Sequence, residues 1–215
     1  MYNTDFEISN EPTYVNININ SHSSIQINDM FFDPFETKNV TKKAKYIFLT
    51  HTHYDHLSID DIKNVITEET IIIATNDAKD KLKEFKNQVI YVNQNEKHTL
   101  DDFEFETFPS YNINKNFHKK ENNWVGYKVT KNGVSYAILG DSDATPELEN
   151  LKCDILFIPV GGTYTMNATE AAKLTNIIKP QIAIPTHYGS IVGVKNDAKI
   201  FADNLDDDII CKTFI

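Results

Sequence analysis

The sequence is poor in cysteine: only two of its 215 residues are Cys, and they lie far apart at Cys153 and Cys211. A chain of this length buries most of the surface that its unfolded form exposes, so it needs no disulfide bonds to fold. Each cysteine lies in or beside an apolar stretch. We therefore expect both to be small buried side chains in a reducing compartment.

Long hydrophobic runs are absent too. No apolar stretch approaches the roughly 20 residues needed to span a bilayer, and residues 1–10 are polar and acidic, unlike a secretory signal peptide. We expect a cytoplasmic protein without a membrane partner.

Positive charge is scarce. The chain has 21 Lys and Arg against 31 Asp and Glu, a formal net charge of −10. Proteins that bind nucleic acid through its phosphates usually carry a basic patch, and none stands out here. We expect no nucleic-acid partner. The oligomeric state stays open, a homo-oligomer included.

What the sequence does contain is an alternation of short apolar runs with helical patterns, which predicts an α/β fold in a single domain over residues 1–215. Hairpins are expected at residues 24–32 and around Asn132-Gly133. The expected strands are 14–19, 24–27, 30–32, 46–49, 70–74, 88–92, 99–108, 124–130, 135–139, 155–160, 182–185 and 209–214. The expected helices follow Ser58, cover 76–85, follow Asn167 and cover 197–204.

Three of these apolar runs, 46–49, 137–139 and 182–184, each end within a few residues of His or Asp. A rigid sheet that delivers polar groups at its strand ends is how α/β folds build sites. Residues 109–123, by contrast, are polar and rich in Asn, which predicts a long loop, and loops of this length are often functional.

The densest chemistry lies in the cluster His51, His53, Asp55 and His56. In an extended chain the period of two places the first three on one side, and a tight turn brings His56 round. Imidazole and carboxylate donors at this density suit zinc, or iron or manganese. The alternative is surface or hydrogen-bonded core histidines, but solvated histidines are unexpected directly after a buried strand.

Distant residues can complete such a site. Asp141 can bridge two metals, and His187 follows a strand-ending Pro-Thr pair. Taken alone, Asp141 is better explained as a turn residue and His187 as a hydrogen-bonded polar residue. The cluster shifts both interpretations toward metal ligands.

These residues resemble the metallo-β-lactamase superfamily. The stretch His51-Thr52-His53-Tyr54-Asp55-His56 is similar to its HxHxDH signature, Gly140-Asp141 to its bridging-aspartate motif, and Pro185-Thr186-His187 to its last histidine. The resemblance is nearest to its short, single-domain metal-dependent hydrolases. It implies a four-layer αβ/βα sandwich with the site at the edge of the sheets. Further shared features are Asp33-Pro34, residues 111–114 through His118, residues 124–127 and residues 159–164.

The resemblance also implies two metal ions, which are zinc or alternatively manganese or iron, and a set of protein ligands for each ion. His51, His53 and His118 are assigned to the first ion; Asp55, His56 and His187 to the second; Asp141 bridges them. His118 stands seven residues beyond the position where the superfamily has its histidine. It is either that ligand or a loop residue that binds substrate or nothing.

Other residues have secondary roles. Asp33 is a candidate acceptor for a ligand histidine or simply an Asp-Pro turn. His22 is a candidate for the pocket rim, and Lys119 and Tyr164 are candidate substrate contacts. His98 is interpreted as a surface residue.

The function that follows is hydrolysis of an ester, lactone, amide or phosphodiester bond in a small substrate by a metal-bound hydroxide, with Asp55 as a catalytic residue that can orient the nucleophile. The alternatives are a metal-dependent sensor or binding protein without turnover, and a nuclease-type phosphodiesterase of the same superfamily. The acidic charge and the short chain disfavour the nuclease.

Overall fold

The computed structural model describes residues 2–6, 15–38, 40, 42–101 and 103–214. The chain divides into two compact units: unit 1 is Met1–Val92 with Phe214–Ile215, and unit 2 is Asn93–Thr213. Each unit holds one seven-stranded sheet of mixed direction, with helices. The predicted α/β class is therefore confirmed, and the single domain over 1–215 stays a prediction.

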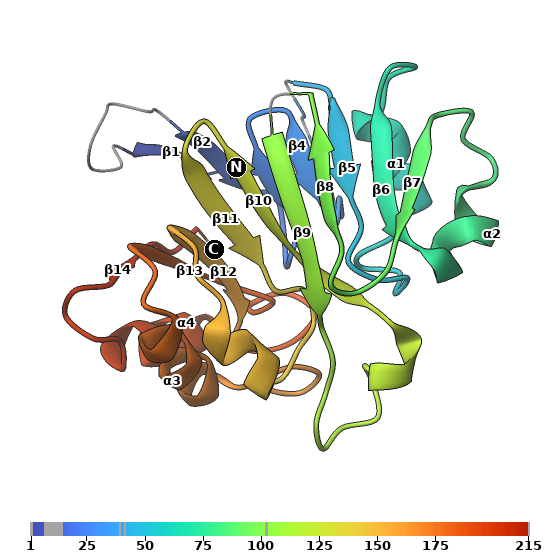
Figure 1. Ribbon diagram of the computed structural model, residues 1–215. Helices are drawn as coiled ribbons and strands as arrows, with labels where there is room; N and C mark the ends of the chain where they lie inside the picture. The colour runs from blue at the N-terminus through green and yellow to red at the C-terminus, as the bar shows by residue number, and fades with distance from the viewer. Residues whose placement is uncertain (1, 7–14, 39, 41, 102, 215) are drawn as a thin grey trace. The chain divides into compact units, whose positions relative to one another are not determined.

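The sheet of unit 1 runs in chain order from β1 to β7 and is coloured from blue to green in Figure 1. The strands β1 to β4 pair antiparallel, and β4 to β7 pair parallel. Their bounds are β1 Tyr2–Phe6, β2 Val15–Ile19, β3 Ile25–Ile27, β4 Met30–Phe32, β5 Tyr46–Phe48, β6 Ile71–Thr75 and β7 Val89–Val92.

Unit 1 has its own hydrophobic core on one face of this sheet. The helix α1 (Ile59–Val65) buries Ile62 and Val65 among apolar side chains of β4, β5 and β6. Ser58 begins the helix as predicted, because its side chain accepts a hydrogen bond from the backbone N–H of Asp61. The core fixes the loop between β5 and α1, which carries the His51–His56 cluster.

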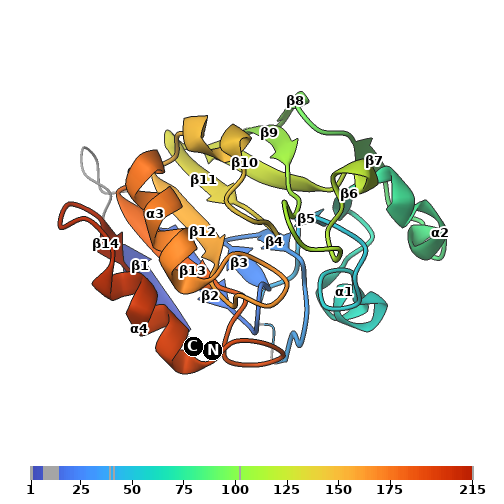
Figure 2. The same cartoon turned by 90° about the horizontal axis from the view of Figure 1, so that it is seen from below.

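The sheet of unit 2 has the order β14-β13-β12-β11-β10-β9-β8, antiparallel from β8 to β11 and parallel from β11 to β14. The helices α3 (Ala168–Ile178) and α4 (Lys195–Asp203) lie side by side in both Figure 1 and Figure 2. The strand bounds are β8 Lys97–Leu100, β9 Phe103–Pro109, β10 Val125–Lys131, β11 Val134–Ile138, β12 Ile155–Pro159, β13 Ile182–Thr186 and β14 Ile210–Cys211.

Three sequence predictions were wrong in extent. Residues 99–108 form parts of two antiparallel strands, β8 and β9, because Asp101 turns the chain with a left-handed φ of 45°. The helix expected at 76–85 is a 3-10 turn, Asn76–Ala78, followed by a short α2, Lys79–Leu82. The last strand pairs with β13 only at Ile210 and Cys211.

Two short elements lie within stretches expected to be irregular: the 3-10 turns η2 (Lys120–Asn122) and η3 (Pro146–Asn150). The strand β1 was not predicted at all, since its residues are polar and show no apolar alternation. None of these differences moves the strand ends that carry the candidate site residues.

The parallel strands of each unit place polar residues at one sheet edge. In unit 1, Asp33 follows β4 and Thr50 and His51 follow β5. In unit 2, Asp141 follows β11 and His187 follows β13, with β12 between them. Because neighbouring parallel strands end at the same edge, each pair is brought together within its own unit.

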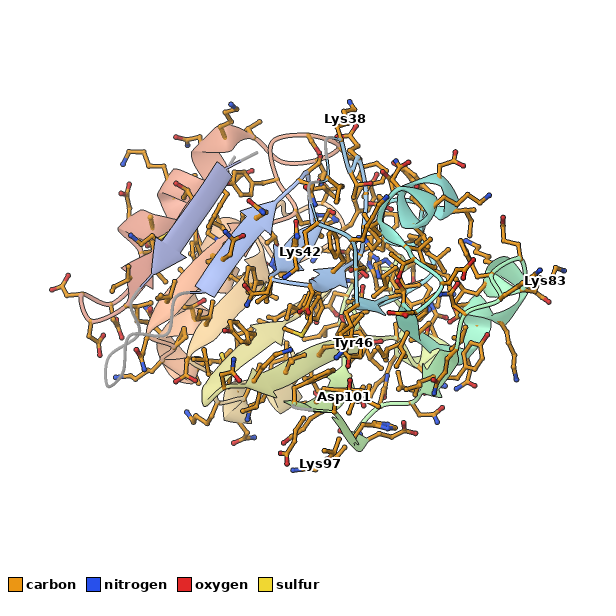
Figure 3. The ribbon with its side chains drawn as sticks, turned by 90° about the horizontal axis from the view of Figure 1, so that it is seen from above. Lys38, Lys42, Tyr46, Lys83, Lys97 and Asp101 are labelled. Carbon is orange, nitrogen blue, oxygen red and sulfur yellow. The ribbon has the colours of Figure 1, made fainter. Side chains whose placement is uncertain are left out.

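The surface carries extended charged side chains. Lys83, at the end of α2, and Lys97, at the start of β8, project outward in Figure 3, and their side chains are 77% and 78% exposed. The longest helix of the described residues, α3, has 11 residues, and none of the described helices has the length and apolarity to cross a bilayer.

We predict that Gly126→Ala lowers the free energy of unfolding by about 2–3 kcal/mol, the cost of overpacking a well-packed site. Gly126 lies on β10 opposite Phe108, and a Cβ there would lie 2.1 Å from Cε2 of Phe108 and 2.8 Å from the carbonyl oxygen of Ile138. Urea denaturation measures the change. The matched control is Gly133→Asn, since no atom lies within 4 Å of a Cβ at Gly133 and Asn tolerates its positive φ. An equal loss in both variants would contradict the steric explanation.

Candidate metal centre

The cluster of unit 1 lies on the tight turn between β5 and α1. The backbone N–H groups of His56 and Leu57 both donate to the carbonyl oxygen of His53, at 3.1 and 2.8 Å. This turn reverses the extended segment His51–His53, as the sequence suggested for His56. All four residues of the cluster therefore belong to one rigid connection between a buried strand and a packed helix.

Asp33 is the polar centre of this region. Its buried carboxylate accepts three hydrogen bonds: Oδ1 from the backbone N–H of Thr50 at 2.8 Å, and Oδ2 from the Thr50 hydroxyl at 2.6 Å and from Nδ1 of His56 at 2.7 Å. Hydrogen bonds to a buried carboxylate are short and strong. The turn of Asp33-Pro34 thus fixes the start of the histidine cluster.

These contacts determine which nitrogen of each imidazole carries the proton. Nδ1 of His56 donates to Asp33, which leaves Nε2 with its lone pair. The hydroxyl of Thr50 uses its only proton toward Asp33, so at 3.0 Å it accepts from Nδ1 of His51. We therefore assign the Nδ1–H tautomer to His51 and His56, and both present Nε2 as a ligand atom.

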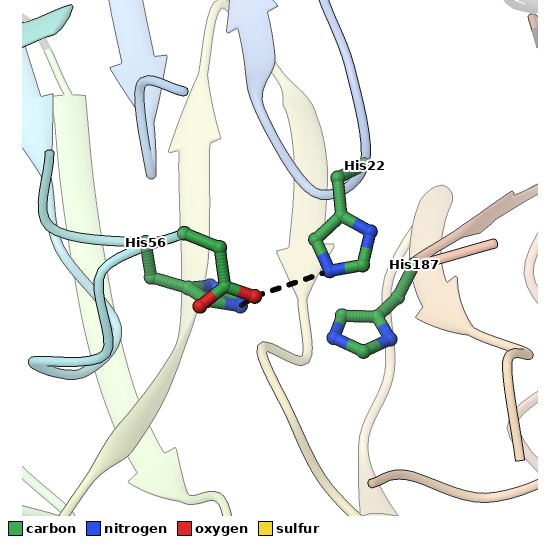
Figure 4. Close-up of side chains that lie close together, drawn as sticks. His22, His56 and His187 are labelled. Carbon is green, nitrogen blue, oxygen red and sulfur yellow. Dashed lines mark ion pairs between the residues drawn. The ribbon is translucent and has the colours of Figure 1, made fainter. Parts of the chain in front are cut away.

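The other donors of unit 1 lie next to these two. Nε2 of His51 is 3.1 Å from Nδ1 of His53. Oδ2 of Asp55 is 3.7 Å from Nε2 of His56 and 3.3 Å from Nε2 of His22, the contact drawn as a dashed line in Figure 4. One ligand atom from each of His22, Asp55 and His56 lies within 4.8 Å of the others.

Unit 2 contributes a second set of donors around Asp141. Nε2 of His187 lies 2.9 Å and Nε2 of His118 lies 3.2 Å from Oδ2 of Asp141, and all three side chains are at most 2% exposed. The loop after Pro109 therefore folds back and brings His118 to the aspartate. Of the two interpretations that the sequence left open, this position favours the ligand.

Asn112 holds His118 in place. Its side-chain oxygen accepts from the backbone N–H of His118 at 3.1 Å and from Nδ1 at 3.2 Å, and its own backbone N–H donates to the carbonyl oxygen of His118 at 2.7 Å. An amide oxygen can only accept. His118 therefore also carries its proton on Nδ1 and presents Nε2 toward Asp141.

One candidate substrate contact, Lys119, lies in the same loop, and the other, Tyr164, lies between β12 and α3 and contacts this loop. The side-chain amide of Asn112 donates to the carbonyl oxygen of Tyr164 at 2.9 Å, and the ring of Tyr164 meets that of Phe117 edge to face, with centroids 4.7 Å apart. Lys119 lines an open cavity of about 560 Å³ in unit 2 together with Tyr111 and Asn112.

Backbone strain marks several of these positions. His22, Asp33 and His187 have φ values of 52°, 45° and 58°, the left-handed region that side chains with a Cβ rarely adopt. Such strain persists only where the surrounding structure holds it, and it concentrates at functional sites.

The other titratable residues discussed from the sequence, His98 and the two cysteines, belong to neither of these donor sets. His98 stacks on Phe105 with ring centroids 4.7 Å apart, and its side chain is 29% exposed, so it is half-buried rather than on the surface as expected. The cysteines are free and only half-buried. Burial raises the pKa of the Cys153 thiol to about 12 and that of Cys211 to about 11, so both stay protonated at neutral pH.

The donor set fits a divalent transition metal. Imidazole nitrogens together with buried carboxylates are the ligands of zinc, manganese and iron sites. His51, His56 and His118 each have Nδ1 hydrogen-bonded to an oxygen, the arrangement that orients metal-bound histidines. The two donor sets are therefore consistent with a metal site.

Sequence reasoning missed Thr50 and Asn112, which orient His51 and His118. Asn112 lies in residues 111–114, which the resemblance included among its shared features, but the resemblance gave Asn112 no role. Thr50 had no signal of its own, because its function depends on the proton that it gives to Asp33, a residue 17 positions away in sequence.

The chain is similar in sequence to a known family of proteins. A family model described as a β-lactamase superfamily domain matches residues 18–187. A UPF0173 metal-dependent hydrolase from Thermococcus onnurineus is 26% identical over 191 residues, which are 83% of this chain and 85% of that protein.

The fold of the chain is also similar to that of solved structures. A proposed metal-dependent hydrolase from Parabacteroides distasonis is 27% identical with a TM-score of 0.84, covering 99% of this chain and 98% of its own. A metallo-β-lactamase fold protein from Bacillus subtilis is 13% identical with a TM-score of 0.69, covering 97% of this chain and 92% of its own, a likeness of fold alone. The metallo-β-lactamase fold that the sequence predicted is thereby confirmed.

We predict that Asp33→Ala lowers the free energy of unfolding by about 3–5 kcal/mol, because it leaves two buried donors of Thr50 and one of His56 without their acceptor, at about 1–3 kcal/mol each. Urea denaturation in the presence of a chelator measures this without any contribution from metal. The control is Asp77→Ala, an exposed aspartate that also accepts from two hydroxyl groups. Its loss should stay below about 1 kcal/mol. Equal losses would show that Asp33 is an ordinary turn residue.

Proposed function

Because the chain belongs to the metallo-β-lactamase superfamily and is similar to its short metal-dependent hydrolases, we propose that it is a hydrolase that holds two divalent metal ions and cleaves a small substrate. The bond is an ester, lactone, amide or phosphodiester. Zinc is the first candidate metal, with manganese and iron as alternatives.

The proposed ligand sets follow the superfamily pattern. By that pattern His51, His53 and His118 would hold the first ion, and Asp55, His56 and His187 would hold the second. Asp141, whose carboxylate His118 and His187 both approach within unit 2, would be shared by the two ions.

One observation carries the proposal: the carboxylate of Asp33 and the hydroxyl of Thr50 commit the Nδ1 protons of His56 and His51. Two imidazoles whose Nδ1 protons are fixed in this way lie on one turn with Asp55, and Asn112 fixes the Nδ1 proton of His118 in the same way. A hydrogen bond to the outer ring nitrogen is how proteins orient metal-bound histidines. This preparation supports metal binding over hydrogen-bonded core histidines.

When bound, a pair of such ions activates water at neutral pH and polarises the oxygen of the bond to be cleaved. The residues of the chain supply position and proton transfer. Asp33 and Asn112 hold ligand imidazoles in orientation, and Asp55 can orient the attacking water and pass its proton toward the leaving group.

The substrate side is proposed to be the loop of residues 109–123. Lys115 and Lys120 are engaged with Asp143 and Glu147, whereas Lys119 forms no ion pair among the described residues of the chain. An exposed lysine on a cavity next to Asn112 favours a substrate with a negative group. Tyr164 and Phe117 offer an aromatic wall for its apolar part.

We predict that His53→Ala lowers bound metal and reduces hydrolysis by more than about 100-fold, since even loss of a residue behind a ligand costs 10- to 100-fold. Metal content is measured on the purified protein by elemental analysis, and turnover on a panel of esters, lactones, amides and phosphodiesters. His98→Ala, a histidine on β8 away from the cluster, is the control and should keep both.

Two results would contradict the proposal. A His53→Ala variant with normal turnover would exclude this cluster as the active centre. A wild-type protein that binds metal but hydrolyses nothing in the panel would instead be a metal-dependent sensor or binding protein.

We predict that Lys119→Ala raises KM for anionic substrates of the panel about two- to five-fold, corresponding to up to ~1 kcal/mol for an exposed charge interaction. Metal content and the KM of neutral substrates should not change. Lys97→Ala, an equally exposed lysine on β8, is the matched control. A KM that rises alike for neutral and anionic substrates would argue against charge recognition by Lys119.

A further inference from the structure

We propose that His22 is an additional metal ligand, which binds the second ion together with Asp55 and His56. The superfamily signature recognised in the sequence contains no such residue, and sequence analysis placed His22 only at the rim of the pocket. The inference rests on the proposed metal centre, but not on its hydrolytic activity.

The first argument is distance. Ligands at 2.0–2.1 Å from a tetrahedral ion lie roughly 3.3–3.4 Å from one another, and about 2.9 Å in an octahedral site. Nε2 of His22 lies 3.3 Å from Oδ2 of Asp55, and Nε2 of His56 lies 3.7 Å from the same oxygen. The separation between His22 and Asp55 equals the edge of a tetrahedral site, and the separation between His56 and Asp55 is about 0.3 Å longer than that edge.

A hydrogen bond within the same unit gives the contrast. Nδ1 of His56 lies 2.7 Å from Oδ2 of Asp33, the length of a charge-assisted hydrogen bond. The contact between His22 and Asp55 is 0.6 Å longer than this one. Asp33 therefore orients a ligand from behind, whereas His22 stands beside Asp55 on the ligand side.

The second argument is the arrangement of the three donors. The side chain of His22 is fully buried, and its ring meets that of His56 edge to face with centroids 6.1 Å apart. Figure 4 shows His22 near His56, with the contact between His22 and Asp55 drawn as a dashed line. One donor atom of each of these three residues lies within 4.8 Å of the others, as the ligands of a single ion must.

The third argument is the backbone. His22 lies in the turn between β2 and β3 with φ of 52°, a conformation that costs a residue with a Cβ roughly 1–2 kcal/mol. The turn is fixed on both sides: the N–H of Ser24 donates to the carbonyl oxygen of Ser21, and the Ser24 hydroxyl oxygen accepts from the N–H of Phe35. Phe35 stands two residues after Asp33, so the turn that aims His22 is tied to the segment that orients His56.

The test replaces His22 by residues that can and cannot ligate. We expect His22→Gln to weaken binding of one of two cobalt or zinc ions by about 100-fold or more, above the range for loss of a residue behind a ligand. We expect His22→Cys and His22→Asp to retain two ions. The Cys variant loaded with cobalt should also show a thiolate-to-cobalt charge-transfer band in the near ultraviolet, which only direct ligation produces.

Affinity is measured by competition with a chromogenic chelator, and circular dichroism of the metal-free variants confirms that each is folded. His98→Cys is the control, because its thiol lies on β8 and should give no charge-transfer band. If His22→Cys folds, binds two cobalt ions and lacks the band, or if His22→Gln binds both ions as tightly as the wild type, His22 is not a ligand. Weaker binding in all three His22 variants, without the band, would assign it instead to positioning Asp55.

The outcomes also separate this inference from the proposed function. A wild-type protein that binds no divalent metal overturns both. A protein with two ions and the charge-transfer band, but without turnover on the substrate panel, retains the inference and overturns the hydrolase.

Discussion

The carboxylate of Asp33, held in a left-handed backbone conformation at the end of β4, joins three parts of unit 1. Through the Thr50 backbone it fixes where β5 ends. Through the Thr50 hydroxyl and His56 it determines the proton positions on two imidazoles. Since a carboxylate accepts but does not donate, the Thr50 hydroxyl and Nδ1 of His56 both donate to Asp33, and Nδ1 of His51 in turn donates to the Thr50 hydroxyl.

In unit 2 a neutral side chain, that of Asn112, orients the candidate ligand histidine. Asn112 accepts from Nδ1 of His118 through an amide oxygen, and its other contacts tie the loop of residues 109–123 to Tyr164. The two histidines are therefore oriented by different groups, His56 by a charged carboxylate and His118 by a neutral amide oxygen.

Much of this arrangement could be predicted because it depends on local periodicity. The strand before His51, the alternation of His51, His53 and Asp55, and the strand ends that precede Asp141 and His187 are all visible in sequence. The turn at Asp101, which divides residues 99–108 into β8 and β9, could not be predicted, since it depends on one left-handed residue inside an apolar alternation. The roles of Thr50 and Asn112 were equally hidden, because a hydroxyl or an amide acquires its role from a partner that only the fold supplies.

His22 shows why the positive φ values matter. Positive φ values also occur at exposed residues such as Glu36 and Lys179, so they do not mark a site by themselves. At His22, Asp33 and His187, three residues on three separate connections, the strained backbone carries a buried imidazole or a buried carboxylate. This common feature links His22 to the residues of the proposed metal centre more closely than its position in the sequence does, and it is independent of the interatomic distances that suggest ligation.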